Sequence, residues 1–187
     1  MSNLRCHLLI GPPASGKTSI AKILAPILKA EIISTDAIRE ELWGDELYQG
    51  PWDEIEEVLH ARLKKFIAED KPVLIDATHA MRPWRLALTQ GIKFNKPVEW
   101  IGWWIRTPKK VCLKWNQKRD RIVDEEVITQ YCAALPFEGD RKEPHSYFHF
   151  RPQRLEGFAT IIHFDPSIGK DNQYVLERLR TLTSQRK

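Results

Sequence analysis

Residues 11–18 read GPPASGKT, and this stretch decides the fold of the chain. It fits the pattern G-x-x-x-x-G-K-[ST], in which a tight loop surrounds phosphate groups. An apolar run at 8–10 precedes the loop, and apolar residues recur at helical spacing between 20 and 28. The spacing predicts a buried strand that enters the loop and a helix that leaves it. A glycine and serine turn that matches by chance would need neither element.

Phosphate binding assigns a role to most residues of this loop. Backbone N–H groups of the loop and of the helix N-terminus point at the anion, and Gly16 has no Cβ to block its approach. Lys17 is expected to reach the β- and γ-phosphates of ATP or GTP, and the Thr18 hydroxyl is expected to hold Mg²⁺. The predicted nucleotide-binding residues of the loop are Gly11, Ala14, Ser15, Gly16, Lys17 and Thr18.

Length and composition predict one α/β domain over residues 1–187, with enough chain to bury a core. No apolar run has membrane-spanning length and no signal-peptide pattern is present, so we expect no membrane association. Cys6, Cys112 and Cys132 match neither a metal spacing nor a disulfide framework. This favours buried or inert thiols and a cytoplasmic location. The sequence leaves the oligomeric state open.

Charge is spread unevenly along the chain. Residues 31–70 carry a net charge of −8, whereas residues 82–121 carry +9. A basic segment beside a phosphate loop suits an anionic ligand, which is either the nucleotide alone or a phosphorylated substrate as well. The alternative is a solvated basic face, and charge alone does not separate it from a nucleic-acid footprint.

Strand and helix patterns alternate along the chain, which predicts a parallel sheet with helices on both faces. The predicted strands span 4–10, 31–34, 72–79, 98–105 and 160–164. The predicted helices span 17–28, 36–44, 51–69, 82–94, a segment from 108, 124–134 and 172–182. Trp100, Trp103 and Trp104 are expected to fill the core, with base stacking as the alternative.

Two acidic residues end predicted strands, at the edge where an open α/β sheet binds its ligands. Asp36 follows the second strand, and Arg39 lies one helical turn further on. Asp76 ends the apolar part of the third strand, where a carboxylate can position a Mg²⁺-bound water or a nucleophile. Asp36 could instead be only a helix cap, and many plain strands end in a residue such as Asp76.

Basic residues near two predicted helices complete the candidate set. Arg85 lies near a helix start, where positive charge is unfavourable, so we expect it to have an anionic partner. The segment 108–135 reads as helix, basic turn 118–121 and helix, which is typical of a lid that supplies cations to transferring phosphates. A solvated basic turn is the alternative. His145 and His149 have no third ligand nearby, so no metal site is predicted there.

Taken together, these stretches resemble the 5′-kinase domain of polynucleotide kinases, the P-loop phosphotransferases that phosphorylate a nucleic-acid 5′-hydroxyl. The resemblance covers about residues 4–165 and rests on the order of its pieces. The pieces are GPPASGKT, STD with Arg39, LIDATH with Arg85, TPKKVCLKWNQKRDR, VDEEVI and LEGF. The resemblance implies a P-loop NTPase/kinase fold with a helical lid, ATP and Mg²⁺ as cofactors, and a DNA or RNA 5′ end as partner.

The resemblance also implies roles for single residues. Asp36 matches the carboxylate that accepts the hydroxyl proton, and Arg39 matches the arginine that grips the phosphate next to that hydroxyl. Arg119 matches a lid arginine that stabilises charge on the moving phosphoryl group. The predicted catalytic residues are therefore Asp36, Lys17 and Arg119. The predicted substrate-binding residues are Arg39, Asp76 and Arg85, and the predicted metal ligand is Thr18.

Two positions depart from the family pattern. Trp115 stands where the lid motif R-N-x-x-R has its first arginine, and His79 ends a third-strand motif that often ends in Asn. These departures leave open how a base is handled and whether the acceptor is a polynucleotide. The expected function is ATP-dependent transfer of a phosphoryl group to a polynucleotide 5′-hydroxyl. The alternatives are a kinase for a sugar, nucleoside or antibiotic, and a nucleotide-binding signalling module that hydrolyses ATP slowly.

Overall fold

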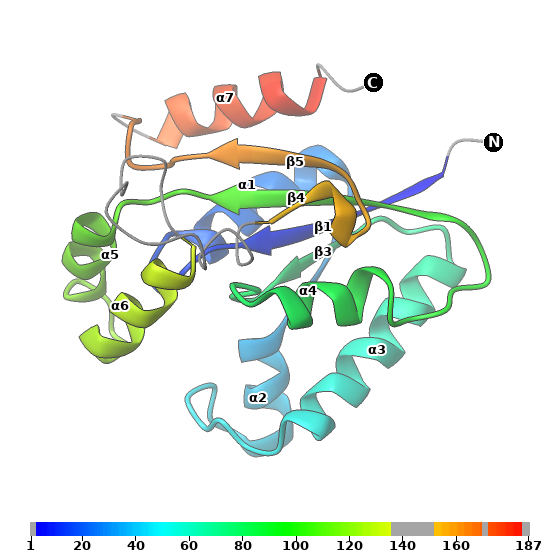
Figure 1. The fold of residues 1–187 in the computed structure, drawn as a ribbon, viewed down its shortest axis with the longest axis horizontal. Helices are drawn as coiled ribbons and strands as arrows, with labels where there is room; N and C mark the ends of the chain where they lie inside the picture. Colours follow the sequence, from blue (N-terminus) through cyan, green and yellow to red (C-terminus); the bar gives the residue numbers. More distant parts are fainter. Residues whose placement is uncertain (1–2, 136–151, 170–171, 185–187) are drawn as a thin grey trace.

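The computed structural model describes residues 3–135, 152–169 and 172–184. In these ranges five parallel strands form one sheet in the order β2-β3-β1-β4-β5 (Figure 1). The strands are β1 (Leu4–Ile10), β2 (Glu31–Ser34), β3 (Val73–Asp76), β4 (Val98–Ile105) and β5 (Phe158–Phe164). The helices are α1 (Lys17–Leu28), α2 (Thr35–Trp43), α3 (Trp52–Ala68), α4 (Arg82–Thr89), α5 (Lys109–Asn116), α6 (Glu125–Ala134) and α7 (Asn172–Ser184). The predicted parallel sheet is confirmed.

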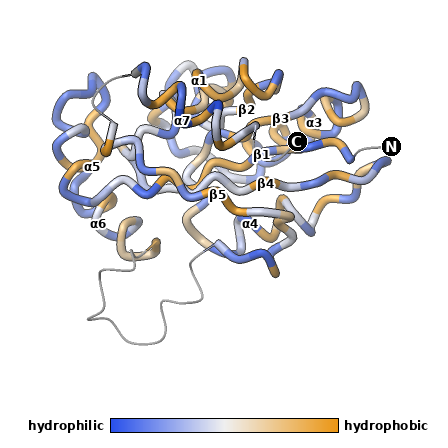
Figure 2. Tube along the Cα trace, turned by 90° about the horizontal axis from the view of Figure 1, so that it is seen from above, coloured by the Kyte–Doolittle hydropathy of each residue, from blue (hydrophilic) through white to orange (hydrophobic). Residues whose placement is uncertain are grey.

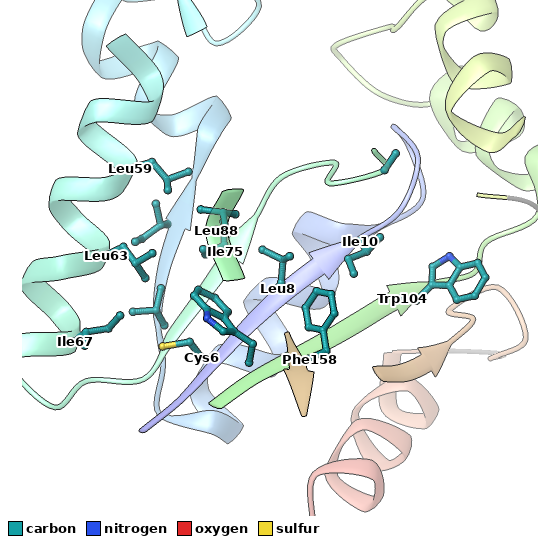
Figure 3. Close-up of a cluster of buried hydrophobic side chains, with 14 of the residues drawn as sticks. Cys6, Leu8, Ile10, Leu59, Leu63, Ile67, Ile75, Leu88, Trp104 and Phe158 are labelled. Atoms are coloured by element: carbon teal, nitrogen blue, oxygen red, sulfur yellow. The ribbon is translucent and has the colours of Figure 1, made fainter. Parts of the chain in front are cut away.

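Helices cover both faces of the sheet, as the alternation of patterns predicts. In β1, Leu8 and Ile10 pack on the face covered by α3 and α4, while Leu9 packs on the face covered by α1 and α7. Figure 2 shows α1 and α7 above the central strands and α4 below them. Figure 3 shows Leu59 and Leu63 of α3 directed at the sheet. Both faces are buried, so the central strands read as continuous apolar runs.

The three tryptophans of β4 belong to these two cores. Trp103 is 1% exposed and packs with α1, while Trp100 and Trp104 pack on the opposite face. The interpretation of these residues as core is confirmed, and their rings offer no free face for base stacking.

Three predicted boundaries need correction. The third strand ends at Asp76, so residues 77–79 are a loop that leaves the sheet edge. The helix predicted for 82–94 ends at Thr89, because the chain folds back at Gly91, whose N–H donates to the carbonyl of Leu86. The last strand begins two residues earlier than predicted, at Phe158 instead of Thr160, because a short 3₁₀-helix, η2 (Arg154–Glu156), ends at Gly157 with a φ of 89°.

Arg85 lies at the centre of a buried ion pair that joins α4 to η2. Its guanidinium donates through Nη2 to Glu156 Oε1 at 3.0 Å and through Nε to Glu156 Oε2 at 2.5 Å. It also donates to the carbonyls of His79 and Ala80, and both charged side chains are fully buried. The expected anionic partner of Arg85 is therefore a carboxylate of the protein. The prediction that Arg85 binds substrate is wrong, because the guanidinium has no access to a ligand.

We expect Glu156→Ala to lower the free energy of unfolding by about 3–5 kcal/mol, because it leaves the Arg85 guanidinium buried without its counter-charge. Denaturant unfolding measures this change. The matched control is Glu99→Ala, which breaks the exposed pair with Arg5 and is expected to cost at most about 1 kcal/mol. Equal losses in the two variants would contradict a structural role for the buried pair.

Helices α5 and α6 lie beyond the carboxyl ends of β4 and β5, at the end of the sheet to which the strand arrows point (Figure 1). They occupy most of the predicted lid segment 108–135. Cys112 of α5 and Cys132 of α6 share a side-chain hydrogen bond, so two of the three thiols that are distant in sequence are neighbours in space. None of the described helices is long and apolar enough to pass through a bilayer. His145 and His149 lie outside the described residues.

Candidate active site

The glycine-rich loop between β1 and α1 has the backbone that its sequence requires. Gly16 has a φ of 89° and Ala14 a φ of 57°, which places both residues in the left-handed region. Gly11 lies tightly packed, since a Cβ on it would be 2.9 Å from Ser15 Oγ and 3.1 Å from the carbonyl oxygen of Ile105. The hydroxyl of Thr107 donates to the carbonyl of Ser15 at 2.7 Å and ties the loop to the end of β4.

The polar atoms of this loop fit a phosphate group. Lys17 is buried, and its ammonium group donates to the carbonyl of Pro12 at 2.7 Å, across the loop. Ser15 Oγ is also buried and finds no hydrogen-bond partner among the described residues. A buried hydroxyl and a buried ammonium group around an open loop are the donors that a phosphate would need. The observed geometry therefore fits the predicted nucleotide-binding residues.

Burial lowers the pKa of Lys17 to about 8, although the carboxylates of Asp76 and Asp36 favour its charged form. The ammonium group, not the neutral amine, attracts phosphate. We therefore expect nucleotide affinity to fall as pH rises through 8, by about tenfold between pH 8 and pH 9.5. Bound phosphates favour the charged amine, so binding at pH 8.5 should take up a proton.

Calorimetry of ATP binding in buffers with different ionisation enthalpies measures this proton uptake. Lys17→Met, which cannot titrate, should abolish the proton uptake. Proton release, or affinity that rises with pH over this range, would contradict the assignment. The lowered pKa of Lys17 also makes the stability of the fold depend on pH. Between the folded pKa of about 8 and the ordinary value of 10.5, the unfolded chain binds more protons at residue 17, so wild-type stability relative to Lys17→Met should rise with pH.

Thr18 and Asp76 bring a hydroxyl and a carboxylate together beside Lys17. Their side chains share a hydrogen bond, although Thr18 begins α1 and Asp76 ends the neighbouring strand β3. Burial raises the pKa of Asp76, and Lys17 opposes the shift. Mg²⁺ in phosphate sites usually takes only one or two protein oxygens and keeps several waters. Thr18 and Asp76 fit that donor set, and Mg²⁺ there would neutralise phosphate charge.

Asp36 faces the same cleft from the other side. Its carboxylate accepts a hydrogen bond from Arg39 Nη1 at Oδ1 and another from Arg121 Nη1 at Oδ2, both at 2.8 Å. The helix cap is Ser34, whose Oγ accepts the N–H of Ala37. The interpretation of Asp36 as only a cap is therefore wrong, because Ser34 caps the helix and the Asp36 carboxylate pairs with two arginines.

One cleft of about 440 Å³ joins these groups. The residues that line it include Thr18, Asp36, Asp76, Arg119 and Arg121. These residues come from four places: the start of α1, helix α2, the end of β3, and the turn between α5 and α6. The sheet order places β3 beside β1 and β2 beside β3, so the carboxyl ends of these strands meet at one edge. The chemistry predicted from distant stretches is thus brought together, except for Arg85.

The two positions that depart from the family pattern both lie next to the phosphate loop or the strand that enters it. Trp115 of α5 packs over Gly16, since a Cβ on Gly16 would be 3.3 Å from its ring. His79 is buried, and its Nδ1–H donates to the carbonyl of Leu9 at 3.1 Å. Burial lowers the pKa of His79 to about 4, so this ring is neutral near pH 7 and supports the loop instead of supplying charge.

Sequence reasoning missed three residues that the structure places in or behind the site. The sequence pattern places Arg121 in the basic turn 118–121 but assigns a role to Arg119 alone. Glu156 lies within the LEGF stretch and holds Arg85. Thr107 precedes Pro108 at the end of β4 and holds the phosphate loop. Each acts through a partner at least 71 residues away, so no local spacing signals it.

A parallel sheet in this order, with a phosphate loop between β1 and α1 and a helical pair over the strand ends, defines the P-loop kinase fold. The chain belongs to the AAA domain family, whose model matches residues 6–136. No curated protein sequence matches the chain.

Several solved structures share the fold at low identity. A candidate kinase from Chloroflexus aurantiacus is 15% identical, with full coverage of both chains and a TM-score of 0.63. A sugar kinase from Janibacter is 18% identical, with 98% of this chain and 95% of that chain covered and a TM-score of 0.61. The Pnkp1/Rnl/Hen1 RNA repair complex contains a chain that is 16% identical, with a TM-score of 0.60. There the match covers 82% of this chain but 49% of the other.

Proposed function

We propose that this protein transfers the γ-phosphoryl group of ATP to an alcohol, and that the alcohol is the 5′-hydroxyl of a polynucleotide. The observation that carries the proposal is the position of Asp36. Its carboxylate shares one cleft with Thr18 and Arg119, and its charge acts on both Lys17 and Asp76. A module that only binds or slowly hydrolyses nucleotide needs no such carboxylate opposite the phosphate loop.

Phosphoryl transfer requires little covalent help from a protein, and positioning with compensating positive charge accounts for most of the catalysis. Lys17 and Arg119 would bind the phosphates from the loop side and from the turn between α5 and α6. Asp36 would orient the acceptor hydroxyl and accept its proton as the oxygen attacks phosphorus. Mg²⁺ held by Thr18 and Asp76 would supply further charge compensation.

Two observations support a polynucleotide acceptor. The segment 82–121 carries a net charge of +9, and it includes the turn that lines the cleft. Arg39 lies beside Asp36, where a phosphate next to the acceptor hydroxyl would be bound. The RNA repair complex with the same fold is consistent with this acceptor class.

A small-molecule acceptor is the second candidate. The match covers 95% of the sugar kinase chain. It covers 49% of the chain from the RNA repair complex. Trp115 and His79 also stand where the polynucleotide kinase pattern differs. These observations favour a sugar or a related alcohol, with the same roles for Lys17 and Asp36.

A transfer assay with labelled ATP separates the candidates. Oligonucleotides of DNA and RNA with a 5′-hydroxyl, nucleosides and sugars are offered in parallel, with 5′-phosphorylated oligonucleotides as the matched control. Product on the 5′-hydroxyl oligonucleotides alone supports the proposal, and binding that weakens steeply with salt would agree with several phosphate contacts. Product on a sugar alone selects the second candidate. Hydrolysis of ATP without any labelled acceptor would contradict both.

A further inference from the structure

Two thiols meet between the helices of the predicted lid segment. Cys112 of α5 is fully buried, whereas Cys132, near the end of α6, is half-buried. The two helices lie side by side (Figure 1), and the two side chains share a hydrogen bond. The third thiol, Cys6 of β1, is fully buried and packs in the core on the face covered by α3.

The contact makes the two thiols chemically different. One thiol has one proton, so the Cys112 S–H serves either the carbonyl of Thr107, at 3.5 Å, or the sulfur of Cys132. The hydrogen bond from Cys112 lowers the pKa of Cys132 and raises the pKa of Cys112 itself. The positive charges of Lys109 and Lys17 also lower the pKa of Cys132. Peroxides oxidise such a cysteine, which is partly exposed, has cations nearby and contacts a second thiol.

We propose that Cys112 and Cys132 are a redox modification site, at which a hydroperoxide forms a reversible disulfide that slows phosphoryl transfer. The Cys132 thiolate attacks one peroxide oxygen, the O–O bond breaks, and the departing hydroxide takes up a proton to leave as water. Cys132 is then a sulfenic acid, oxidised by two electrons. The Cys112 sulfur attacks this sulfur, the S–O bond breaks, and the second water carries away the Cys112 proton. A dithiol reductant reverses the reaction by thiol–disulfide exchange.

The disulfide would act on the turn 117–124, which joins α5 to α6. A disulfide holds its sulfur atoms about 2.05 Å apart, closer than any hydrogen bond, so the two helices have to approach each other. The Asn116 amide already ties α5 to the far end of the turn, because it donates to the carbonyl of Val123 at 2.7 Å and accepts the Val123 N–H at 3.0 Å. The disulfide would therefore close a covalent ring around Arg119 and Arg121, which both line the cleft.

A second connection leads from the thiols to the phosphate loop. Oxidation removes the S–H with which Cys112 donates to the carbonyl of Thr107. The hydroxyl of Thr107 in turn donates to the carbonyl of Ser15 at 2.7 Å. Disulfide formation therefore disturbs both the turn that supplies arginines and the loop that binds phosphate.

We expect oxidation to lower kcat/KM for transfer about 10- to 100-fold, because a displacement of about 1 Å at a catalytic group can cost about 100-fold in rate. This part of the inference rests on the proposed phosphotransferase function. The formation of the disulfide does not depend on that function, so the two parts are tested separately.

Mass spectrometry tests the modification site without any acceptor. The fully reduced protein is treated with stoichiometric hydrogen peroxide, alkylated and digested without reductant. We expect loss of two of the three free thiols and one cross-linked peptide pair that joins Cys112 to Cys132. Dithiothreitol should restore all three thiols. Cys6, whose pKa burial raises to about 11, is the internal control and should stay unmodified. Absence of the cross-link, or a cross-link to Cys6, would overturn the proposal.

Two variants assign the order of the steps. Cys112→Ser removes the second thiol, so Cys132 should stop at the sulfenic acid, which dimedone labels. Cys132→Ser removes the thiol that reacts first, so dimedone should label Cys112 at least about tenfold more slowly than it labels Cys132 in the other variant. Equal labelling of the two cysteines would contradict the assignment of Cys132 as the thiol that peroxide attacks.

Transfer kinetics test the effect of the disulfide. The oxidised wild type should be about 10- to 100-fold slower than the reduced wild type and should recover in dithiothreitol. Cys132→Ser should equal the reduced wild type before and after peroxide. Unchanged kcat/KM in fully cross-linked protein would overturn the effect on transfer and leave the transferase proposal standing. A reduced protein that forms the disulfide but phosphorylates no acceptor would contradict the transferase proposal and support the modification site.

Discussion

Lys17→Ala is expected to lower kcat/KM for phosphoryl transfer by about 10³-fold or more, because it removes a preorganised positive charge from the transferring phosphates. ATP affinity should fall about 10- to 100-fold as well, since a charge-assisted hydrogen bond is lost. Steady-state kinetics and calorimetry measure the two effects. The ammonium group of Lys17 is buried and donates to the carbonyl of Pro12.

The stability of Lys17→Ala distinguishes lost function from lost fold. Burial of the Lys17 ammonium group is unfavourable, as its lowered pKa indicates, so its removal should leave the melting temperature unchanged or higher at pH 7. Lys64→Ala, an exposed lysine of α3, serves as the control and should behave as wild type. Retention of more than a tenth of wild-type transfer by Lys17→Ala would remove Lys17 from the catalytic set.

Asp36→Asn is expected to lower kcat for transfer by about 10²- to 10⁴-fold, the usual contribution of a positioned general base. The amide keeps the size of the side chain but cannot take the hydroxyl proton. ATP affinity should change by less than about threefold, because in the proposed mechanism Asp36 contacts the acceptor hydroxyl and, as an anion, compensates no phosphate charge. This contrast between kcat and ATP affinity separates Asp36 from Lys17.

A matched carboxylate on the same helix controls for charge. Glu41→Gln removes the exposed ion pair with Arg62 on α3, so its activity should equal that of the wild type. Transfer by Asp36→Asn at the wild-type rate would contradict the assignment of Asp36 as the base. It would also remove the argument that the cleft accepts an alcohol. Nucleotide binding at the phosphate loop would be unaffected by that result.

Local sequence signals determined most of the fold. GPPASGKT between an apolar run and a helical pattern predicted the phosphate loop, and the alternation of strand and helix patterns predicted the parallel sheet. The helices predicted for 36–44 and 51–69 agree with α2 and α3 to within about one residue at each end. These features depend on neighbours within a few residues, so a one-dimensional pattern contains the information.

Only the tertiary structure decided which charged groups meet. Arg85 and Arg121 are both arginines near helix ends in a basic segment, yet Arg85 is buried against Glu156 whereas Arg121 reaches Asp36 in the cleft. The partners lie 71 and 85 residues away, and their pairing depends on sheet order and helix packing. An ion pair carries no periodicity of its own, so a sequence specifies the charges available but not their partners. The phosphate loop was therefore predictable residue by residue, whereas the pairing of Asp36 with Arg121 across the cleft was not.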